Sequence, residues 1–180
     1  MTSPADILAF WFDEAGPAAW YRRDPAFDAL IRDRFGALVE EALAGRLDGW
    51  AETPDGLLAL VVLLDQFPRN LFRDDPRAYA GDPKARALAH RALADGLDAA
   101  LPPPRRQFLY MPLMHSEDVA DQALCVEKFA AMGEPDALFY ARLHHAIVER
   151  YGRFPHRNAA LGRADTPDEA RFMATLGIRF

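Results

Sequence analysis

Two similar polar motifs, far apart in the sequence, each follow a long apolar segment. Residues 65–70 read Asp-Gln-Phe-Pro-Arg-Asn, and residues 153–158 read Arg-Phe-Pro-His-Arg-Asn. In both motifs Phe-Pro stands where the backbone is expected to break, and Arg-Asn comes just after it. Polar groups beside bulky apolar residues need hydrogen-bond partners, which come either from the protein or from a ligand. The two motifs therefore predict a polar site.

The first motif allows a structural and a ligand-binding interpretation. Asp65 and Arg69 are four residues apart, so one helical turn would place them side by side. Asp65 directly follows the apolar run at residues 57–64, and a buried carboxylate needs a cation or several donors. In the structural interpretation Arg69 only neutralises Asp65. In the other interpretation Arg69 and Asn70, with Gln66 beside them, present donors to a ligand.

A second group of polar residues reads Met-His-Ser-Glu-Asp at residues 114–118. Glu117 and Asp118 would lie in the first turn of a helix, where the helix dipole favours negative charge. Asp118 also has the helical spacing to share a face with Gln122, which is expected to point inward. An inward carboxylate beside His115 could act as a general acid–base pair or belong to a metal site.

The third group is the motif at residues 153–158, in a segment from 152 to 165 for which the sequence predicts no secondary structure. Arg153, His156 and Arg157 carry N–H donors suited to a phosphate or a carboxylate, and Asn158 follows them. The same side chains could instead attach a long loop to the body of the protein. Both interpretations stay open at this point.

The composition favours a single domain that spans residues 1–180. The chain is 51% hydrophobic and carries a net charge of −6 without a long run of like charges, so we expect no nucleic-acid partner. The longest apolar stretch, residues 57–64, is too short to cross a bilayer. No signal peptide is recognisable, so we expect no membrane association and a cytoplasmic location. The single cysteine, Cys125, excludes an intrachain disulfide and a cysteine-based zinc site.

Apolar spacing predicts helices throughout the chain and no strand. One helix is expected to begin at Pro54 and to end at Pro68, and it should be central because residues 57–64 are apolar on all sides. Pro112 is expected to kink or end another helix. Helices separated by short breaks are typical of antiparallel helix pairs, as in helical solenoids.

The second half of the chain carries further helix signals. Ser116 is expected to cap a helix over residues 117–132, and Thr-Pro-Asp-Glu at 166–169 is a capping box for the last helix. His144 and His145 are adjacent on a predicted helix and point about 100° apart. We expect one of them to be a hydrogen-bonded core histidine, and the two together cannot easily chelate one metal.

The chain resembles a widespread, mostly bacterial family that is known only as a domain of unknown function. The resemblance covers almost the whole chain. It implies an all-helical, right-handed superhelical fold similar to tetratricopeptide repeats, and it implies no established activity. The residues that carry it are Leu8-Ala9-Phe10-Trp11-Phe12, Leu64-Asp65-Gln66-Phe67-Pro68-Arg69-Asn70, Met114-His115-Ser116-Glu117-Asp118, and Arg150 to Asn158 with Leu161-Gly162-Arg163.

Our first functional hypothesis is a site for a small anionic molecule, formed where the three polar groups meet. No reaction and no cofactor follow from the sequence, and we include no metal in the predicted site. If the protein is an enzyme, the candidates for proton transfer are His115, Asp118 and His156. The predicted ligand-binding residues are Asp65, Gln66, Arg69, Asn70, Arg153, Arg157 and Asn158.

The alternative hypothesis is a helical protein-interaction module. Helical repeat folds present grooves to a peptide, a partner helix or a second copy of the chain. In that case the polar residues would satisfy one another, and their role would be structural. A small-molecule site explains better why the polar residues are concentrated in three short motifs, since a groove would use residues spread along helix faces.

Overall fold

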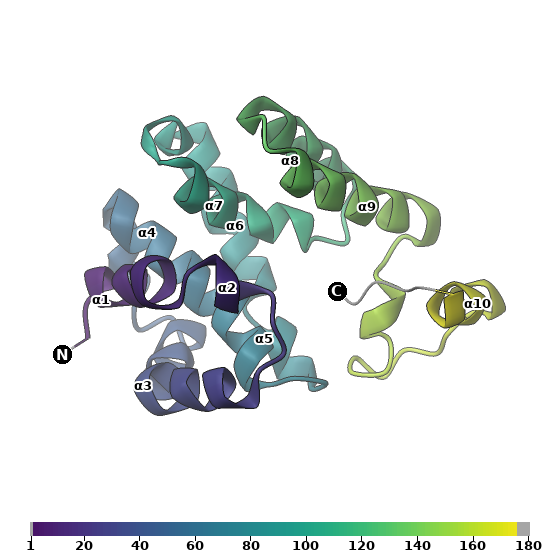
Figure 1. The fold of residues 1–180 in the computed structure, drawn as a ribbon, viewed down its shortest axis with the longest axis horizontal. Coiled ribbons are helices and arrows are strands. Elements are labelled where there is room, and N and C mark those ends of the chain that lie inside the picture. Colours follow the sequence, from purple (N-terminus) through teal and green to yellow (C-terminus); the bar gives the residue numbers. More distant parts are fainter. Residues whose placement is uncertain (1, 176–180) are drawn as a thin grey trace. The chain divides into compact units, whose positions relative to one another are not determined.

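The computed structural model describes residues 2–175, which form helices with short connections and contain no strand (Figure 1). The all-α prediction is therefore confirmed. The chain forms two compact units: unit 1 holds the residues up to 73 and 77–112, and unit 2 holds 74–76 and the residues from 113 onward. A single domain over residues 1–180 and a tetratricopeptide-like superhelix both stay predictions.

Most helices of unit 1 begin with a proline, whose missing N–H costs nothing in the first turn. Side chains of Ser3, Asp24 and Thr53 accept backbone hydrogen bonds at three of these starts. The helices are α1 (Pro4–Leu8), α2 (Pro17–Trp20), α3 (Pro25–Leu43), α4 (Pro54–Val61), α5 (Phe67–Leu71), α6 (Asp82–Ala94) and α7 (Pro103–Met114), with 3₁₀ turns at Asp48–Glu52, Pro76–Tyr79 and Leu97–Ala100. The last two residues of α7 and the first residue of the turn Pro76–Tyr79 belong to unit 2.

The core of unit 1 is built around α4. Residues 57–64 are all buried, as their apolar pattern predicts, and α1 and α6 pack against this helix. Next to it lies a cluster of aromatic rings in which Trp11 contacts both Phe67 and Phe108. The central position of this helix is therefore confirmed.

The expectation that Pro68 ends the central helix is wrong. After α4 the backbone widens into a π-helical segment, Val62–Gln66, in which the N–H of Phe67 donates to the carbonyl of Val62. An α-helical bond to the carbonyl of Leu64 would need an N–H at position 68, where proline has none. The wider π-helical turn accommodates the missing hydrogen bond, so the helix continues as α5.

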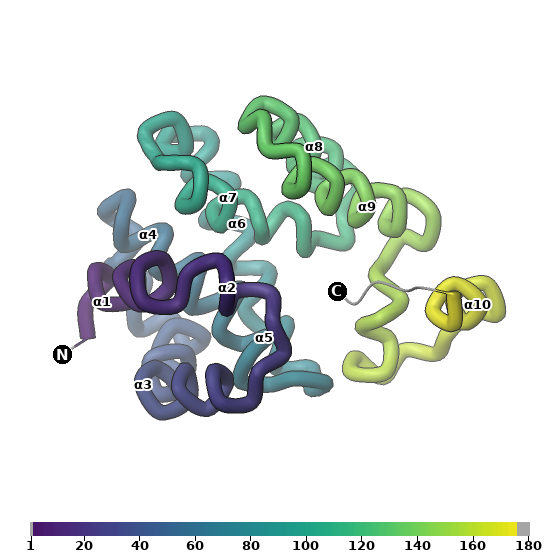
Figure 2. The backbone as a smooth tube through the Cα atoms, in the orientation of Figure 1, coloured from purple at the N-terminus to yellow at the C-terminus, as the bar shows by residue number. Residues whose placement is uncertain are grey.

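Unit 2 is formed by a helix pair and a third, separate helix. Helices α8 (Val119–Met132) and α9 (Pro135–Tyr151) pack side by side and antiparallel, joined at Gly133 with a φ of 74° (Figure 1). From α9 the chain continues through residues 152–166 to α10 (Pro167–Thr175), as Figure 2 traces. Among residues 2–175, no helix is long and apolar enough to span a membrane.

Three local predictions for this part of the chain need correction. Asp118, rather than Ser116, caps α8, because the Oδ1 of Asp118 accepts from the backbone N–H groups of Ala120 and Asp121. Pro112 lies inside α7, which continues to Met114, so the alternative that Pro112 ends the helix is wrong, while the kink stays a prediction. The segment after α9 contains a 3₁₀ turn, Pro155–Arg157, where we predicted no secondary structure.

Candidate functional site

The first motif forms an ion-pair network inside unit 1. Asp65 is fully buried, and its carboxylate accepts a hydrogen bond from the side-chain amide of Gln66. The Nη1 of Arg69 lies 3.3 Å from the Oδ1 of Asp65. The same guanidinium holds Asp82 by two hydrogen bonds of 2.9 and 3.0 Å. Burial alone would lower the pKa of Arg69, but the charges of Asp82 and Asp65 raise it, so this residue stays charged.

Asn70, the last residue of this motif, belongs to a second network in unit 1. Its Nδ2 donates to the Oδ1 of Asp28 at 2.8 Å, and Arg73 holds the same carboxylate at 2.5 and 2.7 Å. Burial acts to raise the pKa of Asp28, but the hydrogen bonds from Arg73 and Asn70 lower it below its ordinary value. The networks of Asp65 and Asp28 tie α5 to α6 and to α3.

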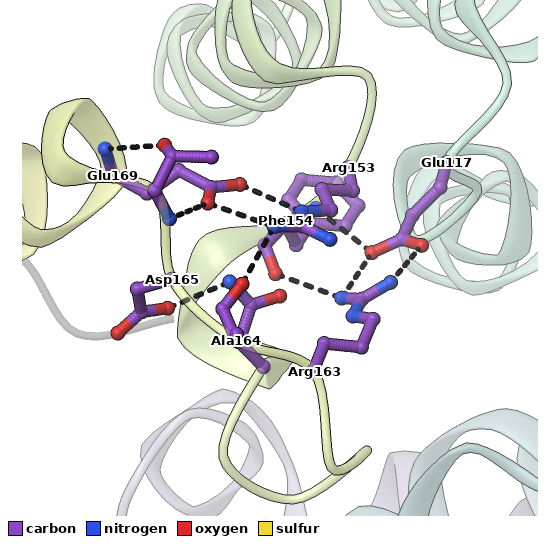
Figure 3. Close-up of polar contacts among 9 residues, drawn as sticks. Glu117, Arg153, Phe154, Arg163, Ala164, Asp165 and Glu169 are labelled. Atoms are coloured by element: carbon purple, nitrogen blue, oxygen red, sulfur yellow. Dashed lines mark hydrogen bonds and ion pairs between the residues drawn. The ribbon is translucent and has the colours of Figure 1, made fainter.

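The second and third motifs come together in unit 2. Glu117 accepts two hydrogen bonds from Arg163, at 2.7 and 2.9 Å, and a third from the backbone N–H of Phe154 at 2.8 Å (Figure 3). Burial acts to raise the pKa of Glu117, but these donors lower it. The contact joins the start of α8 to the segment after α9.

Arg153 of the third motif anchors α10. Its guanidinium holds Glu169 by bonds of 2.6 and 2.8 Å and also donates to the carbonyl of Ala164 (Figure 3). Glu169 closes the predicted capping box with Thr166, which is thereby confirmed. The hydrogen bonds from Arg153 and Thr166 lower the pKa of Glu169 to about 2.

Two side chains of unit 2 hold backbone carbonyls of residues 113–116, which belong to the same unit and include the last two residues of α7. The Nε2 of Gln122 donates to the carbonyls of Leu113, Met114 and Ser116, at 3.3, 2.7 and 2.7 Å. The Nη2 of Arg157 donates to the intervening carbonyl of His115 at 2.9 Å. A helix end leaves such carbonyls without partners, so these two side chains complete it.

Imidazole and guanidinium groups gather around the buried ring of Phe154. The rings of His144 and His156 each lie 5.5 Å from it, and the Cζ of Arg157 lies 4.5 Å from its centre. The ring of His115 lies 6.4 Å from that of His144. We name His115, His144, Phe154, His156 and Arg157 the Phe154 cluster. His144, with Nδ1 2.8 Å from the carbonyl of Tyr140, is the buried histidine that we expected.

Two buried amide oxygens in unit 2 accept no hydrogen bond from any residue between 2 and 175. They are the Oε1 of Gln122 and the Oδ1 of Asn158. Both residues are buried, at 0% and 1% exposure. Sequence reasoning placed Asn158 in the site but left Gln122 out, although its inward position was predicted from helical spacing.

The prediction that Asp118 points inward is wrong. Its carboxylate caps α8 and the residue is exposed. The buried carboxylate of this helix belongs to Asp121, which accepts a 2.6 Å hydrogen bond from the Oγ of Ser116. Within residues 2–175, no three His, Cys, Asp or Glu side chains are grouped closely enough to hold a metal ion.

Comparisons with known proteins agree with this all-helical architecture. The sequence profile of a family described as "Bacterial protein of unknown function (DUF924)" matches residues 7–177. A solved structure of a protein of unknown function from Agrobacterium tumefaciens aligns with a TM-score of 0.89 and 44% sequence identity, covering 94% of this chain and 96% of that chain. None of the curated proteins compared with the chain matches it. The chain therefore belongs to this bacterial family of unknown function.

Proposed function

We propose that the protein binds a small molecule with an anionic group at the Phe154 cluster of unit 2. The observation that carries the proposal is a gathering of one guanidinium and three imidazoles. Arg157, His144 and His156 contact the single buried ring of Phe154, and the ring of His115 lies beside that of His144. Arginine and histidine N–H groups form the charge-assisted hydrogen bonds by which proteins hold phosphates and carboxylates. His115 and His156 are half-buried, so both are accessible from solvent.

The other predicted ligand-binding residues have structural partners that support a different role for them. Arg153 is held by Glu169, and Arg69 is held by Asp82 and Asp65. Gln66 and Asn70 each donate to a buried carboxylate in the same way. We infer that these residues fix the helices of their units. His115 and His156 remain the residues we propose for proton transfer if the protein is an enzyme, because both are half-buried rather than fully buried.

A thermal-shift screen with inorganic phosphate, phosphate monoesters and small carboxylates tests the proposal. A ligand at a hundred times its dissociation constant adds about 2.7 kcal/mol, or roughly 5–10 °C for a chain of this size. We expect at least one of these anions to raise the melting temperature, and His115→Asn or His156→Asn to reduce the rise.

His90→Asn is the matched control, because His90 is an exposed histidine on α6 in unit 1. The ligand-induced rise in the melting temperature of His90→Asn should equal that of the wild type. If none of the anions at 10 mM raises the melting temperature of the wild type, the proposal is wrong. A rise that both His115→Asn and His156→Asn leave unchanged would place the anion elsewhere.

One observation favours the alternative of a protein partner. Phe139 and Tyr140 on α9 are 55% and 45% exposed, and their rings contact each other. Adjacent exposed aromatic residues are enriched where proteins meet. Analytical ultracentrifugation tests self-association through an increase in sedimentation coefficient with protein concentration. If the anion screen is negative, and the double variant Phe139→Ser, Tyr140→Ser abolishes that increase, self-association is the better supported function.

A further inference from the structure

Asn158 presents its side-chain oxygen in an orientation that the surrounding protein sets. Its Nδ2 donates to the Oδ1 of Asp165 at 2.7 Å, and its backbone carbonyl accepts from the N–H of Arg163 at 2.8 Å. Rotating the amide by 180° would place its oxygen against the carboxylate of Asp165, which is repulsive. The Oδ1 of Asn158 is therefore an acceptor aimed away from Asp165.

Gln122 is oriented in the same way by the end of α7. Its Nε2 contacts three backbone carbonyls, and a reversed amide would place an oxygen against three oxygens. Its Oε1 is thus also an acceptor, and it too lacks a donor among residues 2–175. The Nε2 of Gln122 and the guanidinium of Arg157 hold consecutive carbonyls, those of Met114, His115 and Ser116. The amide of Gln122 therefore lies near the Phe154 cluster.

Asn158 is linked to the same cluster by the chain itself. It directly follows Arg157, and its Oδ1 accepts no hydrogen bond from the described residues. A buried amide oxygen without a donor costs about 1–3 kcal/mol. A ligand hydroxyl or ammonium group would supply the missing hydrogen bond, while Arg157 and the imidazoles would hold the anionic end.

We propose that the ligand carries a hydroxyl or amino group beside its anionic group, and that Asn158 and Gln122 select for that donor. This inference rests on the anion site proposed above. It names a chemical class: short hydroxy acids, amino acids, or phosphate monoesters with a neighbouring hydroxyl. A ligand that has only the anionic group would leave both oxygens without a donor, and it should bind more weakly.

Isothermal titration with matched ligand pairs tests this selection on the wild-type protein. The pairs are glycolate against acetate, glycine against acetate, and glycerol 3-phosphate against propyl phosphate. We expect the donor-bearing member of at least one pair to bind about 10-fold or more tightly, which corresponds to one satisfied buried hydrogen bond. The side-chain ¹³C carbonyl resonances of Asn158 and Gln122 should shift with that member and not with its partner.

The outcomes of this titration distinguish a failure of the selection by Asn158 and Gln122 from a failure of the anion site itself. If no member of any pair binds, the anion site and the inference both fail. If both members of every pair bind equally, or if the two amide resonances do not move, the anion site stands and the selection by Asn158 and Gln122 is wrong. Asn158→Leu, checked for folding by circular dichroism, should reduce the difference in affinity between the two members of a pair, and an unchanged difference would exclude Asn158 from the selection.

Discussion

The arginines of this protein pair with carboxylates that differ in how deeply they are buried. Arg69 stands between two carboxylates, of which Asp65 is fully buried and Asp82 is partly exposed. Arg77 forms an ion pair with Glu40 in which both side chains are about half exposed. Charges in water interact weakly, whereas a buried carboxylate without a cation is costly. The two arginines should therefore contribute very differently to stability.

Arg69→Ala should lower the free energy of unfolding by about 3–5 kcal/mol, because it leaves the buried Asp65 without its cation. Arg77→Ala should lower it by about 1 kcal/mol or less. Urea unfolding followed by tryptophan fluorescence measures both. Equal losses in the two variants would show that Asp65 is satisfied without Arg69.

Glu169 makes part of the stability dependent on pH. Its pKa falls from an ordinary 4.5 to about 2, chiefly through the hydrogen bond from Arg153. Because the folded pKa is the lower one, the contribution is complete above about pH 4.5 and is lost as the pH falls towards 2. Urea unfolding by circular dichroism between pH 6 and 2 should show a smaller decline for Glu169→Gln than for the wild type. Glu149 is exposed, so Glu149→Gln should lose stability with falling pH as the wild type does. If the free energy of unfolding fell equally with pH in all three proteins, the assignment to Glu169 would be refuted.

At the scale of elements, the contact between the π-helical segment and the start of α6 requires a glycine. Gly81 lies so close to Leu64 that an added Cβ would come within 2.2 Å of its carbonyl oxygen. This is the same carbonyl to which Pro68 cannot donate an α-helical hydrogen bond, because proline has no N–H. The absence of a side chain at position 81 thus lets α6 approach the widened turn that presents Asp65.

Gly81→Ala should destabilise the protein by about 1–3 kcal/mol, because backbone rather than a flexible side chain must move. Gly49→Ala is the control, since a Cβ there would meet no atom within 4 Å. Thermal or urea denaturation compares the two variants. If Gly81→Ala were as stable as Gly49→Ala, α6 would be able to move away from the carbonyl of Leu64 without loss of stability.

At the scale of the whole molecule, the chain divides at Pro112, inside α7. The three tryptophans, Trp11, Trp20 and Trp50, all belong to unit 1. Unit 2 has its own small apolar cluster of Ile147, Val148 and Phe154. Tryptophan fluorescence therefore reports on unit 1, whereas circular dichroism reports on the helices of both units.

Phe154→Ala should remove about 3–5 kcal/mol from the packing of unit 2, because the ring is fully buried. We expect the transition seen by circular dichroism to begin at lower urea than the transition seen by tryptophan fluorescence. Coincident transitions would instead support the single cooperative domain that composition predicted.

Features that depend on neighbours in the chain were predictable from the sequence. The all-α class, the buried run at residues 57–64, the capping box of α10 and the pairing of Asp65 with Arg69 all follow from spacings of four residues or fewer or from local apolar pattern. Asp118 shows the limit of this reasoning, because a helix that starts two residues later turns the predicted inward carboxylate into an exposed cap.

By itself, the sequence determined that the chain is helical, where most helices begin, and which short motifs hold its polar groups, because capping, proline geometry and apolar periodicity act within one or two turns. Only the tertiary structure decided the partners of those groups. Glu117 meets Arg163 across 46 positions, and Asn70 meets Asp28 across 42. Such pairs form when packing brings distant segments together, and no local spacing encodes that packing. For the same reason, the Phe154 cluster and the two buried amide oxygens became recognisable only in the folded chain.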